Sequence, residues 1–135
     1  MAATHGRLDS QGCPLAVVAI FPEGQPGSAK DFEALIDTGF TGFAQMPKTA
    51  AALLGMQPTA TMDVTFFGGV THPVPVTWGS ARLGADTREG FIILSDSDET
   101  LVGIHFLRLF RKTLIHSAVE EEVILTDRTP NQLGY

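Results

Sequence analysis

Short apolar runs separated by polar turns dominate the chain and predict strands. Residues 14–21 form one such run, a turn cluster occupies residues 23–28, and residues 30–36 return toward Asp37. This pattern is typical of a β-hairpin, because both runs have the length of a strand and the segment between them is rich in Gly, Pro and Ser. The first hairpin therefore ends at an acidic residue.

The rest of the chain continues the pattern of short strands. A single short helix is predicted over residues 48–54, since Pro47 suits a helix start and Gly55 a helix end. The Gly68-Gly69 pair predicts the turn of a second hairpin, and the prolines at 73 and 75 favour an exposed or edge position for its second strand. The predicted strands after the first hairpin are residues 62–67, 70–76, 76–83, 89–94, 101–103, 114–116 and 122–125. Many short strands with one or two short helices indicate a mostly β, compact and closed fold.

Length and composition limit the classes of protein to consider. With 135 residues, 44% of them hydrophobic, the chain suits one well-packed domain and is too short for two. There is no run of about 18 apolar residues and the start lacks the apolar core of a signal peptide, so we expect neither a membrane partner nor export, and a cytoplasmic location. A single cysteine, Cys13, suits a reducing compartment. The net charge of −6 argues against a nucleic-acid partner.

Two motifs far apart in the sequence carry the candidate chemistry. The apolar run Ala34-Leu35-Ile36 ends abruptly in Asp37-Thr38-Gly39, followed by Phe40. The turn residues Thr38 and Gly39 allow a tight polar loop that holds the carboxylate at the floor of a cleft. Downstream, residues 100–102 form a second apolar strand that stops at Gly103 and turns directly into a short apolar helix. An Asp-Thr-Gly triplet alone is common, so the pair of motifs carries the argument.

Together the two motifs resemble those of the retropepsin-like aspartic proteases of clan AA, and Phe40 after the glycine is similar to a small prokaryotic branch of that clan. The resemblance runs from about Pro14 to Leu125. It implies a single-domain closed β-barrel with one or two short helices. The domain spans residues 14–126, after a loose N-terminal segment at 1–13 and before a C-terminal tail at 127–135.

The resemblance implies a homodimeric aspartic endopeptidase acting on peptide or protein substrates. Such enzymes need two carboxylates that share a proton around one water, and this chain offers one Asp-Thr-Gly. Each chain of a two-fold symmetric dimer would therefore supply its own Asp37. Thr38 and Gly39 complete the catalytic triplet, and Thr38 would hydrogen-bond across the axis.

Candidate substrate-binding residues follow from the same resemblance. Phe66, Phe67, Gly68 and Gly69 occupy the position of a flap that closes over an extended peptide, although an ordinary hairpin with inward phenylalanines explains them equally well. Retroviral enzymes place acids after the catalytic triplet and pair them with an arginine after the downstream glycine. Here these positions hold Thr41, Gly42 and Ile104, so both sides of that ion pair are absent and the substrate subsites do not transfer.

Other candidate sites are weaker. Residues 96–100 imitate the opening of a calcium loop but lack its glycine and distal Glu, and the histidines have no spacing typical of a zinc site, so no metal and no cofactor are expected. Cys13 has no catalytic partner and no nucleophile elbow is present. We interpret His105, between two apolar residues, as structural.

Three functions stay open at this point. They are the aspartic endopeptidase, a non-catalytic peptide-binding module on the same fold, and a regulatory or assembly protein. The intact Asp37-Thr38-Gly39 favours the first, because a pure binder does not need an acid placed beside its twin.

Overall fold

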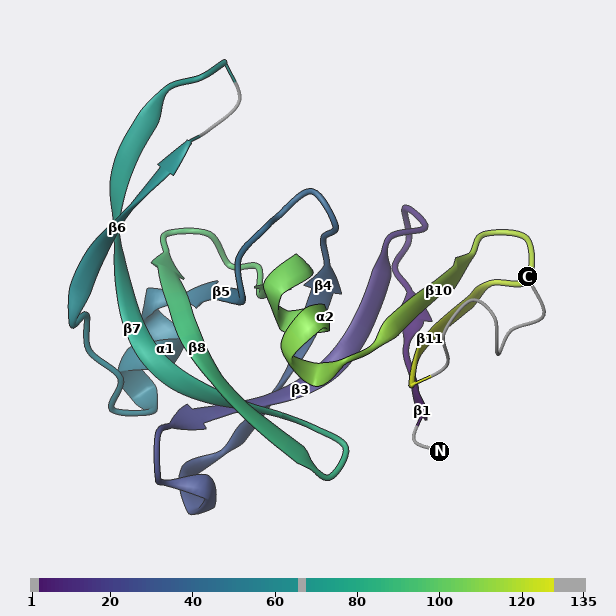
Figure 1. The fold of residues 1–135 in the computed structure, drawn as a ribbon, viewed down its shortest axis with the longest axis horizontal. Helices are drawn as coiled ribbons and strands as arrows, with labels where there is room; N and C mark the ends of the chain where they lie inside the picture. Colours follow the sequence, from purple (N-terminus) through teal and green to yellow (C-terminus); the bar gives the residue numbers. More distant parts are fainter. Residues whose placement is uncertain (1–2, 66–67, 128–135) are drawn as a thin grey trace.

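The computed structural model describes residues 3–65 and 68–127. Strands make up most of it, with two α-helices, α1 (Lys48–Leu53) and α2 (Ile104–Phe110), and a 3-10 turn at Pro26–Ser28 (Figure 1). The strands are β1 (Ala3–His5), β2 (Arg7–Leu8), β3 (Pro14–Pro22), β4 (Lys30–Ile36), β5 (Ala44–Pro47), β6 (Ala60–Thr65), β7 (Thr71–Leu83), β8 (Asp86–Ser95), β9 (Leu101–Val102), β10 (Thr113–Ser117) and β11 (Glu122–Thr126). The chain is thus mostly β, as the sequence predicts.

The main sheet closes on itself. Its eight strands follow the order β2-β3-β4-β9-β5-β8-β7-β6, and β3 also pairs with β7. This additional pairing, from Ala19 opposite Arg82 to Pro22 opposite Gly79, joins the two sides of the sheet. Closure leaves fewer strand edges open for pairing with another chain.

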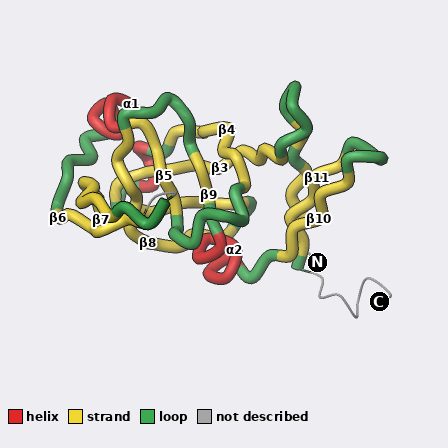
Figure 2. The backbone as a smooth tube through the Cα atoms, turned by 90° about the horizontal axis from the view of Figure 1, so that it is seen from above, coloured by secondary structure: helices red, strands yellow, loops and turns green. Residues whose placement is uncertain are grey.

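A smaller, three-stranded sheet in the order β1-β11-β10 stands to one side of the closed sheet (Figure 2). It contains the closing hairpin that the sequence predicts, with Thr113 opposite Thr126 and Ser117 opposite Glu122. Its third strand, β1, falls in the segment 1–13, which the sequence predicts to be loose. Ala3 to His5 pair with Thr126 to Ile124, and this partner lies too far along the chain for local sequence patterns to reveal the strand.

The core lies inside the closed sheet and is capped by α2. Three side chains of this helix are buried, Phe106, Leu107 and Phe110, and the rings of Phe106 and Phe110 lie 4.5 Å apart, as expected for residues four apart on one helix face. The ring of Phe43 contacts Phe106 at 5.6 Å. In the described part of the chain, neither helix has the length and apolar character needed to span a membrane.

The long strand β7 corrects one prediction. The sequence divides residues 70–83 into two strands, whereas the structure has one strand of 13 residues. The prolines do not interrupt it, because Pro73 and Pro75 lie in the half that pairs with β6 alone, and pairing with β8 starts only at Val76. One edge of the proline-containing half therefore has no strand partner, which is the edge position that proline requires.

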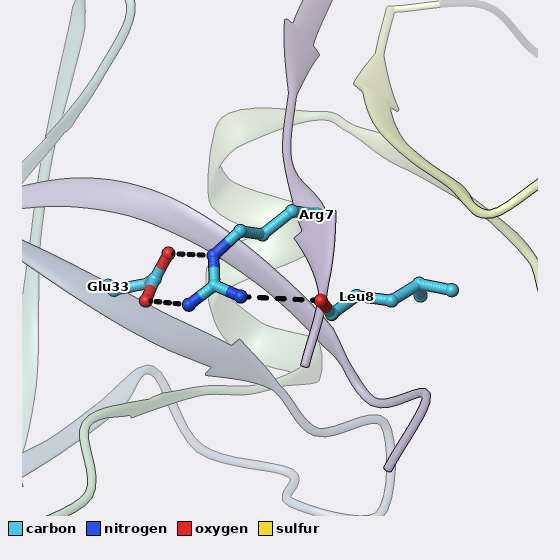
Figure 3. Close-up of polar contacts among 3 residues, drawn as sticks. All are labelled: Arg7, Leu8 and Glu33. Carbon is cyan, nitrogen blue, oxygen red and sulfur yellow. Dashed lines mark hydrogen bonds and ion pairs between the residues drawn. The ribbon is translucent and has the colours of Figure 1, made fainter. Parts of the chain in front are cut away.

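An ion pair fastens the start of the chain to β4 (Figure 3). Arg7 donates from Nε and Nη2 to the two carboxylate oxygens of Glu33, each at 2.6 Å, and Nη1 donates to the carbonyl of Leu8 at 3.3 Å. The hydrogen bonds and the charge of Arg7 hold the pKa of the Glu33 carboxyl below its ordinary value. Both groups are solvent-exposed, so the pair orients β2 more than it stabilises the fold.

Candidate active site

Asp37 directly follows β4, at the point where this strand meets β9. The two strands are parallel, with Ile36 opposite Val102, and the backbone N–H of Asp37 donates to the carbonyl of Val102 at 2.9 Å. Ile36 and Val102 are buried, whereas Asp37 itself is half-buried. The apolar strands thus fix the backbone of an acid whose side chain stays within reach of solvent.

The loop after β4 orients the carboxylate. The backbone N–H of Gly39 donates to Oδ1 of Asp37 at 2.9 Å, and the N–H of Phe40 donates to the Asp37 carbonyl at 3.1 Å. Short Asx-type turns of this kind are typical of Asp followed by a polar residue and Gly. One carboxylate oxygen is thereby held in place, and Thr38, at the outside of the turn, is exposed.

Gly103 lets the segment between β9 and α2 pack directly on this loop. A Cβ at position 103 would lie 2.3 Å from the carbonyl oxygen of Phe40 and 2.5 Å from that of Gly42. The backbone of Gly103 is ordinary extended chain, with φ −122°, so the close approach, rather than a special conformation, requires glycine.

Backbone hydrogen bonds from the start of α2 replace the side-chain ion pair that this chain lacks. The N–H groups of Ile104 and His105 donate to the carbonyls of Phe40 at 2.9 Å and Thr41 at 3.2 Å. These groups begin a helix and have no acceptor within it, so the loop carbonyls satisfy them. The chain therefore anchors its Asp37 loop without a charge at 41, 42 or 104, a solution the sequence does not reveal.

A groove of about 520 Å³ lies beside Asp37. The β6–β7 hairpin, which reaches beyond the neighbouring strands (Figure 1), supplies one wall through Val64 and residues 73–75. The other wall comes from Gln45, Ile93, Leu94, Leu101 and the segment at 95–96. Sequence reasoning missed these wall residues, because their meeting depends on how strands distant in the sequence pair.

The groove contains two acids, and their environments differ. Asp96 is bound by the Nζ of Lys48 at 2.5 Å, whereas the carboxylate of Asp37 has the Gly39 N–H as its partner. Asp37 is thus the carboxylate available for chemistry within the groove of a single chain.

The predicted substrate-binding residues are only partly brought to this groove. Gly68 and Gly69 lie in the hairpin turn with φ of +92° and +79°, both exposed, whereas Phe66 and Phe67 lie outside the described residues. Thr41 and Gly42 line a second, smaller pocket, which Phe40 also lines. The ring of His105 packs edge-on against Phe43 at 6.3 Å. Among the residues described, no three His, Cys, Asp or Glu side chains gather closely enough to hold a metal ion.

Comparison with known proteins connects this geometry to a fold. No protein-family model matches the chain, and no curated protein matches it in sequence. Among solved structures, it is similar to a retropepsin-like aspartic protease from Rickettsia conorii, with a TM-score of 0.59 and 17% identity, over 92% of this chain and 90% of that one. It is also similar to the EIAV protease complexed with the inhibitor HBY-793, with a TM-score of 0.55 and 17% identity, over 79% of this chain and 96% of that one. The chain therefore has the retropepsin-like fold that these aspartic proteases share.

Proposed function

We propose that the protein is a homodimeric aspartic endopeptidase in which each chain contributes Asp37. The observation that carries the proposal is the Asp37 carboxylate, oriented by the Gly39 N–H at 2.9 Å beside a groove large enough for an extended peptide. The fold it shares with aspartic proteases adds support. Likeness at 17% identity concerns the fold, so the activity rests on the site.

The chemistry requires a second carboxylate, and a two-fold dimer supplies it. Two carboxylates about 3 Å apart cannot both be ionised, so the pair holds one proton. The ionised Asp37 takes a proton from a water as the water oxygen bonds to the peptide carbonyl carbon, while the protonated Asp37 of the other chain donates to the carbonyl oxygen. The Asp37 that took the water proton then gives it to the peptide nitrogen as the C–N bond breaks, while the other Asp37 takes back the proton it gave to the carbonyl oxygen, so the pair again holds one proton.

The dimer follows from the same requirement. A two-fold axis near the Asp37 loops places the Asp37 side chains of the two chains opposite each other, because symmetry makes both halves of the interface the same. The exposed Thr38 beside Asp37 is available for a hydrogen bond across that axis. The single cysteine of the sequence is consistent with action in a reducing, cytoplasmic compartment.

The β6–β7 hairpin acts as the flap in this proposal. Its stem already lines the groove through Val64 and Val74. Glycines at 68 and 69 allow the backbone of the turn to approach a bound peptide closely and to change conformation during closure.

A cleavage assay with a diverse peptide library, from acidic to neutral pH, tests the function. We expect the wild type to cleave and Asp37→Asn to lose cleavage completely while it keeps its fold and dimer, because an amide cannot share and pass the proton. Asp98→Asn, an exposed acid in the β8–β9 loop, is the control and should cleave normally. Equal cleavage by Asp37→Asn and wild type would overturn the proposal, and peptide binding without cleavage by the wild type would favour the non-catalytic peptide-binding module instead.

A further inference from the structure

A second pocket, of about 220 Å³, shares Phe40 with the Asp37 groove. Apolar side chains dominate its wall, and we name it the outer pocket. The apolar members are Phe40, Phe43, Met62, Trp78, Phe91 and Ile93.

Two large aromatic residues stand at the outer pocket with unusual exposure. Trp78 on β7 lies directly opposite Phe91 on β8, and their rings meet edge-on at 4.9 Å and 81°. Trp78 is 44% exposed and Phe91 is 43% exposed. The indole N–H of Trp78 donates to Oε2 of Glu23 at 2.8 Å, so the ring is held in one orientation. A rigid aromatic surface left open to water is typical of a binding site.

The outer pocket adjoins the Asp37 groove. Phe40 and Ile93 line both hollows. A peptide extended through the groove and over Phe40 therefore reaches the outer pocket with residues outside the scissile bond, because an extended chain advances about 3.3 Å per residue.

The charge at the outer pocket limits which chemical groups can bind there. Arg108 on α2 lines the outer pocket, and none of the described residues that line it is acidic. In the described part of the chain, the guanidinium of Arg108 has no ion pair with a carboxylate. An apolar wall beside an unpaired cation complements an apolar ring next to a negative charge.

We propose that the outer pocket binds an aromatic side chain of the substrate, with an adjacent acidic residue against Arg108. The volume suits one large side chain, and Trp78 and Phe91 offer edge and face contacts to a ring. This inference rests on the proposed peptidase function and adds a substrate preference to it.

The first test measures binding without cleavage. Trp78 is the single tryptophan of the chain, so its fluorescence reports on the outer pocket. In the Asp37→Asn protein, acetyl-Phe-Glu-amide should change this signal saturably in the millimolar range. Acetyl-Phe-Lys-amide and acetyl-Ala-Glu-amide should each bind at least about threefold more weakly, since one repels Arg108 and the other lacks the ring.

Matched variants assign the effect to residues. Arg108→Gln should reduce the Glu-over-Lys preference by about two- to fivefold, as expected for an exposed ion pair, whereas Arg111→Gln, one turn away and outside the pocket lining, should keep it. Phe91→Ala should weaken acetyl-Phe-Glu-amide, and Val17→Ala, another exposed apolar residue, should not. Absence of a saturable signal, or equal binding of all three probes, overturns the outer-pocket proposal.

A cleavage profile separates this inference from the function it rests on. Peptides cut by the wild type should be enriched in an aromatic-acidic pair at a fixed distance from the cut bond, and the enrichment of the acid should fall in Arg108→Gln. Cleavage that depends on Asp37 but shows no such enrichment contradicts the outer-pocket preference and leaves the peptidase function standing. Absence of cleavage contradicts the peptidase, and the fluorescence titration still decides whether the outer pocket binds.

Discussion

Gly103 packs against Phe40 so closely that a Cβ at position 103 would lie 2.3 Å from the Phe40 carbonyl oxygen. The obstructing atom belongs to the backbone, so no side chain can move aside. The loop that carries Asp37 and the start of α2 are therefore joined at a contact that only glycine permits.

Gly103→Ala should for this reason destabilise the protein by about 3 kcal/mol, as severe overpacking does. Chemical denaturation of the purified variant measures the change. Gly27→Ala is the control, because no atom of residues 3–65 or 68–127 outside its chain neighbours lies within 4 Å of a Cβ at that position, and its unfolding free energy should change by less than about 0.5 kcal/mol. A fully stable Gly103→Ala protein would contradict the close contact.

Gly39→Ala should affect catalysis more than stability. A Cβ at 39 would lie 3.2 Å from Oδ1 of Asp37, the one neighbour within 4 Å in the described part of the chain, so the carboxylate must shift by a few tenths of an ångström. We expect kcat to fall about tenfold or more, because proton transfer depends steeply on position, while the unfolding free energy changes by under about 1 kcal/mol. Steady-state kinetics and denaturation together check this. Equal kcat in Gly39→Ala and wild type would show that the position of the carboxylate is not critical.

The turn of the β6–β7 hairpin should be needed for turnover. Gly69→Ala and Gly84→Ala place a side chain at opposite ends of β7, with φ of +79° and +60° and, chain neighbours aside, no atom of the described residues within 4 Å of either Cβ. Each should cost about 1 kcal/mol of stability through backbone strain, but only Gly69→Ala should lower kcat/KM. Similar kcat/KM losses in both variants would argue against a flap.

Specific activity should rise with protein concentration and level off above the dimer dissociation constant, since each chain supplies one Asp37. Sedimentation over the same concentrations should show the dimer forming in parallel. A monomer with full activity at high dilution would contradict the shared-acid mechanism.

The Arg7–Glu33 pair should contribute stability in a pH-dependent way. Because hydrogen bonds from Arg7 lower the pKa of Glu33 in the folded state, its contribution is present above the unfolded-state pKa, at about pH 4 and higher, and disappears as the pH falls through the folded-state value. Glu33→Gln should therefore be less stable than wild type at neutral pH and equal to it in strong acid. Glu120→Gln, an exposed acid that forms no ion pair with the residues the structure describes, should show no such convergence.

The sequence predicts the elements whose signal is local. The run at 34–36 and the stop at Gly103 are continuous patterns, and both appear as β4 and the junction of β9 with α2. The four-residue spacing of Phe106 and Phe110 likewise fits the buried face of a helix.

What the sequence hides depends on pairing across the chain. The strand β1 has only three residues, and what identifies it as a strand is its pairing with Ile124 to Thr126. The Trp78–Phe91 pair requires the register of β7 on β8. Even the continuity of β7 through Pro73 and Pro75 depends on which of its edges has a neighbour.

The parallel pairing of Leu35 with Leu101 also determines when the site can exist. β9 follows Asp37 late in the chain, so a nascent chain, or a fragment that ends before residue 101, can form the β3–β4 hairpin but lacks the Val102 carbonyl that accepts from the Asp37 N–H. Non-local pairing of this kind forms slowly, because a long stretch of chain must first be ordered. The proposed active site would consequently be complete only after residues 101–102 have paired with β4.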